Sequence, residues 1–214
     1  MSTPIMPFQA GSPMMIVGPT NCGKTCFVHR LLTHDMFTQS ISSILYCYGV
    51  YQPYYDQMKE TLEPPPTFQH GLPTKSEIDA MYDGQFHVIV LDDLMEDIVR
   101  SKDIQQLFTK YCHHLNITAI FISQNIFHQG PYARSISLNS HVIVIFANKR
   151  DESQIRTFAR QIYPVRWKRF ILAYEEIMQE DFAYIVIDCT PSHPRDLKIR
   201  THIFPGEETT TYVI

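Results

Sequence analysis

Short apolar runs alternate with longer amphipathic segments along most of the 214 residues of this chain. Nearly continuous runs such as VIVL and IFIS are typical of strands that are buried on both faces of a sheet. We expect strands at Met14–Val17, Ser43–Tyr48, Phe86–Leu91, Ile117–Ser123, His141–Phe146 and Ala183–Ile187. Helical periodicity lies between them, at Gly23–Thr33, Thr74–Tyr82, Ile104–His114, Glu152–Tyr163 and Trp167–Met178.

This alternation predicts an α/β fold with a mostly parallel central sheet, right-handed crossovers and helices on both faces. A length of 214 residues and a hydrophobic content of 44% suit a single domain over residues 1–214. We expect its core at about residues 14–188. The polar, proline-punctuated tail at residues 189–214 is expected to be a peripheral hairpin or a partner-binding arm.

The segment GPTNCGKT follows the first predicted strand and matches the phosphate-loop pattern G-x-x-x-x-G-K-[ST] at every fixed position. In such a loop the glycines permit backbone angles that a side chain would block, so that the N–H groups between them point at phosphates. Lys24 supplies a mobile cation for the outer phosphates, and the Thr25 hydroxyl joins the Mg²⁺ shell. The candidate nucleotide-binding residues are Gly18, Pro19, Thr20, Asn21, Cys22, Gly23, Lys24 and Thr25.

Two other strand ends carry the remaining groups that phosphoryl transfer requires. HVIVLDD delivers two carboxylates behind a buried strand, with Asp92 as the metal-side acid and Asp93 as the candidate acceptor of a proton from attacking water. FISQN ends the next strand, so Gln124 is placed to contact the γ-phosphate and the lytic water together. In a parallel sheet these ends meet at one edge, where the nucleotide of an α/β protein binds.

A competing motif lies at residues 148–151, where NKRD matches the guanine-reading N-K-x-D pattern of small GTPases. A GTPase should also carry D-x-x-G after its third strand, and here that segment reads DDLM, without the glycine. A GTPase-like switch is therefore our second hypothesis. A nucleoside kinase would need an arginine-rich lid and an acceptor pocket, and the sequence displays neither pattern.

The net charge of −4 does not favour a general coating of nucleic acid. Seven of the eighteen basic residues nevertheless fall in one stretch: Lys149, Arg150, Arg156, Arg160, Arg166, Lys168 and Arg169. This basic segment is either a solvated helix face or a surface that contacts phosphates.

The five cysteines form no C-x-x-C pair, which favours reduced thiols in an intracellular compartment. No apolar run approaches the length that spans a bilayer, so we expect no membrane association.

Four segments together resemble the FtsK–HerA superfamily of P-loop ATPases: GPTNCGKT, VIVLDD, FISQN and NIFHQGPYARSISLNSHVIVIFANKRDESQIRTFARQIYP. Within it, the chain is similar to the genome-packaging ATPases of poxvirus-like large DNA viruses, adintoviruses and Polinton transposons, from about Met14 to Asp188. The resemblance implies a RecA-like core that uses ATP and Mg²⁺, assembles as a homo-oligomeric ring and pumps double-stranded DNA of any sequence into a preformed capsid. A capsid or portal-vertex protein is then a further partner. The protein would act inside the host cell, in the nucleus or cytoplasm, and be associated with the virion.

The resemblance also implies roles for particular residues. Lys24 and Thr25 match the Walker A positions, Asp92 matches the metal-binding acid of Walker B, and Gln124 matches the polar sensor. The chain departs from the family at Asp93, where glutamate is commoner as the catalytic acid.

Rings of this kind usually supply an arginine from one subunit to the ATP of its neighbour. We assign this role to Arg134, with Arg150 as the alternative. NKRD stands where related sequences carry a looser N-x-R-D, which explains the GTPase likeness without guanine recognition. A P-loop ATPase or helicase with no part in packaging stays an alternative.

Overall fold

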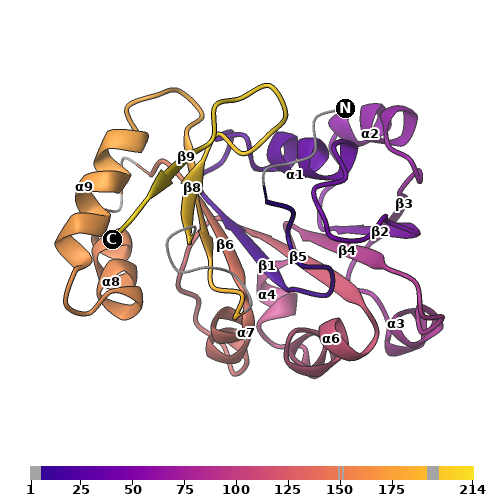
Figure 1. Ribbon diagram of the computed structural model, residues 1–214. Coiled ribbons are helices and arrows are strands. Elements are labelled where there is room, and N and C mark those ends of the chain that lie inside the picture. The colour runs from indigo at the N-terminus through magenta and orange to yellow at the C-terminus, as the bar shows by residue number, and fades with distance from the viewer. Residues whose placement is uncertain (1–5, 149, 151, 192–197) are drawn as a thin grey trace.

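A computed structural model describes residues 6–148, 150, 152–191 and 198–214. Within these residues the strands form one sheet in the order β3-β2-β4-β5-β1-β6-β7-β8-β9 (Figure 1). The strands are β1 (Met14–Val17), β2 (Ser43–Tyr48), β3 (Thr67–His70), β4 (His87–Asp92), β5 (Ile117–Ser123), β6 (Val142–Phe146), β7 (Tyr184–Asp188), β8 (Ile199–Thr201) and β9 (Thr210–Tyr212).

The sheet is mostly parallel, as the sequence predicts. Strands β1 to β6 pair in parallel, because helical connections carry the chain back between them. The pairs β6–β7, β7–β8 and β8–β9 are antiparallel. All six predicted strands are confirmed, with ends within one residue of the expected ones, whereas β3, β8 and β9 were not predicted.

Helices cover both faces of the sheet, which confirms the predicted fold class (Figure 1). The helices are α1 (Lys24–Thr33), α2 (Tyr54–Thr61), α3 (Lys75–Ala80), α4 (Met95–Ile98), α5 (Lys102–Gln106), the π-helical η1 (Leu107–Tyr111), α6 (Cys112–His114), α7 (Ala133–Asn139), α8 (Glu152–Ile162) and α9 (Trp167–Ile177). The five predicted helices are present, and η1 runs between α5 and α6 inside one of them. Helices α2, α4 and α7 were not predicted.

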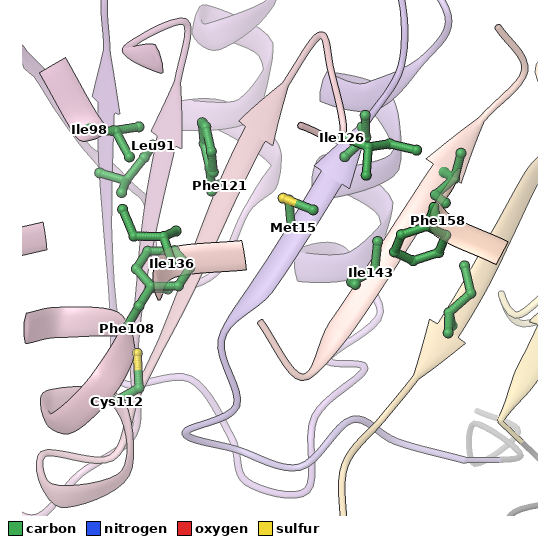
Figure 2. Close-up of a cluster of buried hydrophobic side chains, with 14 of the residues drawn as sticks. Met15, Leu91, Ile98, Phe108, Cys112, Phe121, Ile126, Ile136, Ile143 and Phe158 are labelled. Atoms are coloured by element: carbon green, nitrogen blue, oxygen red, sulfur yellow. The ribbon is translucent and has the colours of Figure 1, made fainter. Parts of the chain in front are cut away.

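Two apolar layers hold the helices to the sheet, because successive side chains of each strand point to opposite faces. On one face, Met15 of β1 and Phe121 of β5 pack with Phe108, Ile136 and Phe158 from the helices (Figure 2). On the other face, residues of α1 and α2 pack against the alternate strand positions. The phosphate loop and the strand ends are therefore anchored from both sides.

The tail continues the sheet beyond β7. Strands β8 and β9 form an antiparallel hairpin, one of the two forms that the sequence suggested for the tail. The side chains of Arg200 on β8 and Asp188 on β7 form an ion pair with an N–O distance of 2.9 Å and exposed fractions of 3% and 0%. The residues of β8 are buried and thus belong to the core, while β9 is the edge strand.

Candidate nucleotide-binding site

A pocket of about 720 Å³ lies at the carboxyl ends of β1, β4, β5 and β6. This volume is in the usual range for small-molecule and cofactor sites. Its lining includes Lys24 and Thr25 at the start of α1, Asp92 and Asp93 at the end of β4, and Gln124 after β5. The pocket thus brings together five residues that the sequence singled out from three separate segments.

The phosphate loop has the backbone form that an anion site requires. Asn21 and Gly23 adopt positive φ angles of 63° and 101°, the second at the N-cap of α1. A loop of this conformation points successive N–H groups toward a common anion site, at the positive end of the helix that follows. The Lys24 ammonium donates hydrogen bonds to the carbonyl oxygens of Gly18 and Pro19 at 2.6 and 2.7 Å, which hold it at the loop.

Gly18 differs from the expectation. Its φ lies outside the left-handed region, so the backbone angle is not the reason for a glycine there. A Cβ at Gly18 would lie 2.6 Å from the sulfur of Cys22 and 2.7 Å from the Cβ of Phe146. Gly18 is therefore required for space, whereas Gly23 is required for its backbone angle.

Asp92 is held by two tyrosines. The hydroxyls of Tyr46 on β2 and Tyr55 on α2 both donate to its Oδ2 oxygen, at 2.8 and 2.9 Å. Burial raises the pKa of Asp92, and the two hydrogen bonds oppose that rise because they favour the ionised carboxylate. Nearby Lys24 also favours the ionised form. Because both hydroxyls use the same oxygen, Oδ1 is the atom available to a ligand in the pocket.

Asp93 and Gln124 lie beside Asp92 with more exposed side chains. Asp93 has a φ of 56°, a left-handed conformation that aspartate tolerates better than most residues. Gly49, just after β2, donates its N–H to the carbonyl oxygen of Asp92 at 3.0 Å. A Cβ at Gly49 would stand only 2.2 Å from the carbonyl oxygen of Asp93. The position of the acid pair therefore depends on a glycine in a neighbouring strand end.

The donor set fits Mg²⁺. Carboxylate and hydroxyl oxygens are the ligands that Mg²⁺ prefers, and it typically binds through one or two protein groups together with substrate phosphates and water. Asp92 and Thr25 line the same pocket and supply such oxygens. Among the described residues there is no group of three or more His, Cys, Asp or Glu side chains that could hold a metal ion by itself.

Sequence reasoning missed the residues that support or extend the site. Tyr46, Tyr55 and Gly49 belong to none of the motifs in the sequence and were not singled out. The far end of the pocket is also new: it is lined by Phe27, Arg30, Phe146, Phe182, Tyr184 and Phe204. No motif links these positions, because they come from α1, β6, β7 and the tail.

The two candidate arginines are outside the lining of this pocket. Arg134 is exposed on α7, and Arg150 is exposed before α8. Of the NKRD motif, Asn148 lines a separate, smaller pocket with residues of α8 and α9. Its Oδ1 accepts a hydrogen bond from the backbone N–H of Arg150 at 3.1 Å. Lys149 and Asp151 lie outside the described residues.

The described part of the basic segment is exposed and gathers around Trp167. The Arg160 guanidinium lies over the Trp167 ring at 4.4 Å, and the Lys168 ammonium at 5.8 Å. Arg166 donates to the carbonyl oxygen of Ile214 at 3.1 Å. Arg160, Arg166 and Lys168 are therefore exposed cations close to the junction of α8 and α9.

All five cysteines lie in described parts of the chain and are free thiols. Cys112, at the start of α6, is fully buried. Within the described ranges, the helices are too short or too polar to cross a bilayer.

Neither the protein-family models nor the curated proteins gave a match to this chain. Solved structures of the same fold did. The genome packaging NTPase B204 of Sulfolobus turreted icosahedral virus 2, in complex with sulfate, superposes with a TM-score of 0.55 at 11% identity, over 89% of this chain and 95% of that one. Its complex with AMPPCP gives 0.55 at 13% identity, over 90% and 97%. B204, the DNA-packaging ATPase of Sulfolobus turreted icosahedral virus, gives 0.57 at 12% identity, also over 90% and 97%. At these identities the likeness establishes a shared fold.

Proposed function

We propose that this protein is an ATPase of the FtsK–HerA type that drives double-stranded DNA into a viral or virus-like capsid. One observation carries the ATPase: a single pocket contains the phosphate loop, two adjacent carboxylates and a strand-end glutamine. These are the groups that bind a triphosphate, hold its metal and orient water. The shared fold with packaging NTPases that were solved with a nucleotide analogue supports the same reading.

The chemistry follows from the positions of the side chains. The loop N–H groups and Lys24 bind the β- and γ-phosphates and stabilise the charge that develops on the transferring group. Thr25 and Asp92 would hold Mg²⁺, which would neutralise part of the phosphate charge. Gln124 orients the attacking water, and Asp93 accepts its proton. Tyr46 and Tyr55 favour the ionised form of Asp92 against the effect of its burial and fix its orientation.

Coupling to DNA rests on the basic segment. A chain of net charge −4 binds DNA only where its cations are gathered, and the exposed cations around Trp167 are such a gathering. In a homo-oligomeric ring this surface would face the channel and contact phosphates without reading bases. The poxvirus-like, adintovirus or Polinton type, the capsid or portal-vertex partner and an intracellular or virion-associated location belong to the same proposal.

The deciding experiment measures ATP and GTP hydrolysis with and without double-stranded DNA. We expect ATP hydrolysis that DNA stimulates, and Lys24→Ala should lose it by orders of magnitude because the phosphoryl group loses a direct cationic contact. Hydrolysis by Lys24→Ala near the level of the unmodified protein would reject the site. A GTP preference of about a hundredfold, or 2.7 kcal/mol, would favour the GTPase-like switch instead.

The DNA surface is tested by replacing Arg166, Lys168 and Arg169 together with alanine. DNA affinity should fall for every sequence, and its salt dependence should flatten because fewer counterions are released. DNA-stimulated hydrolysis should fall while basal hydrolysis stays. Binding of DNA as tight as that of the unmodified protein would exclude this surface.

The ring is tested through Arg134. Arg134→Ala should retain DNA binding and lose hydrolysis. Mixing it with Lys24→Ala subunits should restore part of the activity, because a Lys24→Ala subunit can supply its intact Arg134 to the intact phosphate loop of a neighbouring Arg134→Ala subunit. If mixing restores nothing, Arg134 is not shared between subunits, and Arg150 is examined in the same way.

A further inference from the structure

The pocket has two ends of different chemistry. One end holds Asp92, Asp93 and Gln124, at the carboxyl ends of β4 and β5. The other end is aromatic and lies over β6 and β7, with Phe146 of β6, Tyr184 of β7 and Phe182 of the turn before β7. The phosphate loop follows β1, which lies between β5 and β6 in the sheet, so it separates the two ends.

This order fixes the direction of a bound nucleoside triphosphate. Its γ-phosphate belongs at the acid end, because the metal-side carboxylate and the water-orienting glutamine are there. The base must then extend past the loop toward β6 and β7. A Cβ at Gly23 of the loop would lie 3.6 Å from the Phe146 ring and 3.7 Å from the Phe182 ring, so the aromatic end directly adjoins the phosphates.

The aromatic end is closely packed on the side of the protein core and exposed on the side of the pocket. Phe27 packs edge-on against Tyr184 and Phe204, with ring centroids 4.9 and 5.1 Å apart. The Arg30 guanidinium lies over the Phe204 ring, 4.0 Å from its centroid. Phe182 is 70% exposed although it lines the pocket. The exposure of this apolar ring to water is unfavourable, and a flat ligand that stacked on the ring would bury it.

The C-terminal tail is tied into this end. Glu207 forms an ion pair with Arg30, with an N–O distance of 2.5 Å. Its second oxygen accepts hydrogen bonds from the Tyr184 hydroxyl and the Phe204 N–H, both at 3.2 Å. Glu207 thus fixes Arg30 and Phe204 together and makes the tail a wall of the pocket.

We infer that the aromatic end is the subsite for the nucleobase, which stacks on the Phe182 ring and the Arg30 guanidinium. The inference rests on the proposed function, and it makes stacking the feature that sets the base preference of the ATPase site. Stacking accepts any base, because every base has a π-face, and it favours purines for their larger face. The six side chains at this end do not offer the paired donor and acceptor groups that would read guanine, since the Tyr184 hydroxyl is engaged by Glu207. ATP and GTP should therefore bind within about tenfold of each other.

Calorimetry on the full chain with Mg²⁺ tests the subsite by comparing ATP with inorganic tripolyphosphate, which has no base. Phe182→Ala should weaken ATP binding about fivefold to 150-fold, the usual effect of removing a stacked ring, and leave tripolyphosphate binding unchanged. Phe182→Trp should retain ATP. Tyr82→Ala removes a ring that is equally exposed, at 72%, but lies outside the pocket lining, and should change neither affinity.

Two results would overturn the subsite: ATP affinity unchanged in Phe182→Ala, or equal losses of ATP and tripolyphosphate. A failure of the proposed function gives a different pattern, in which Lys24→Ala binds tripolyphosphate as tightly as the unmodified protein. For the tail, Glu207→Gln should raise the KM for ATP at unchanged kcat, because it loosens Arg30 without touching the acid end. An unchanged KM would remove the tail from the subsite.

Discussion

Replacing Gly49 with alanine should slow hydrolysis although Gly49 carries no chemistry. Its backbone φ lies outside the left-handed region, so an alanine meets no strain from the chain itself. The conflict is one of space, because the new Cβ would lie 2.2 Å from the carbonyl oxygen of Asp93. Side-chain carbons essentially never come closer than 3.0 Å to such an atom, so the Asp93 carbonyl must move by at least about 0.8 Å.

That movement falls on the acid pair. The Gly49 N–H also bonds to the carbonyl of Asp92 at 3.0 Å, so the two strand ends cannot separate without losing this bond. The backbone of Asp93, and with it the Asp93 carboxylate, then shifts relative to the phosphate loop. Displacements of about 1 Å between reacting groups cost on the order of a hundredfold in rate. We expect kcat to fall by about that factor and the KM for ATP to change little.

Steady-state hydrolysis and thermal unfolding together give the assay, with Gly71→Ala as the matched control. Gly71 has open space around its Cβ position but a φ of +82°, so its alanine variant should lose about 1–2 kcal/mol of stability and keep its kcat. If Gly49→Ala is merely destabilised, with the kcat of the unmodified protein, the link between this contact and the position of Asp93 is refuted.

Three further predictions concern the buried and reacting carboxylates. Asp93→Asn should still bind ATP and Mg²⁺ but lose hydrolysis, and unchanged turnover would place the proton acceptor elsewhere. Tyr55→Phe removes a hydrogen bond that opposes the burial-driven rise in the pKa of Asp92, so that pKa rises further. The acid limb of the kcat/KM profile should therefore move to higher pH, and an unmoved limb contradicts this role. Arg200→Met removes the buried ion pair with the Asp188 carboxylate. Removing one partner of such a pair should cost about 3–5 kcal/mol in urea unfolding; a loss below about 1 kcal/mol would contradict it.

The sequence predicts the parts of the site that local patterns encode. The phosphate loop and the acid pair each follow an apolar run, and one strand with its next residues is enough to identify them. The missed strands lack that signal. Strand β3 reads TFQH, and β8 reads IRT with a buried arginine that is stabilised by its ion pair with Asp188. A buried charge is invisible to hydrophobic periodicity.

The aromatic end was not predictable for a different reason. Arg30 and Glu207 are 177 positions apart, and Phe182 is a single exposed aromatic residue in the turn before β7. Each looks ordinary alone, and only the antiparallel return of β7 and the tail brings them together. Gly18 shows the opposite case: the motif identifies the glycine correctly, but its reason is the nearby Phe146 side chain from β6.

The two ends of the pocket should affect the kinetics separately. A base stacked on Phe182 has the same contact in the ground state and in the transition state, so losing that contact raises KM and leaves kcat unchanged. A displaced Asp93 acts only while water attacks, so it lowers kcat. The two groups lie on opposite sides of the phosphate loop, and the free-energy effects of such separated pairs usually add. The double variant Gly49→Ala/Phe182→Ala should therefore have the kcat of the first and the KM of the second. A KM below that of Phe182→Ala alone, or a kcat well below that of Gly49→Ala alone, would mean that the base and the acid pair are coupled through the loop.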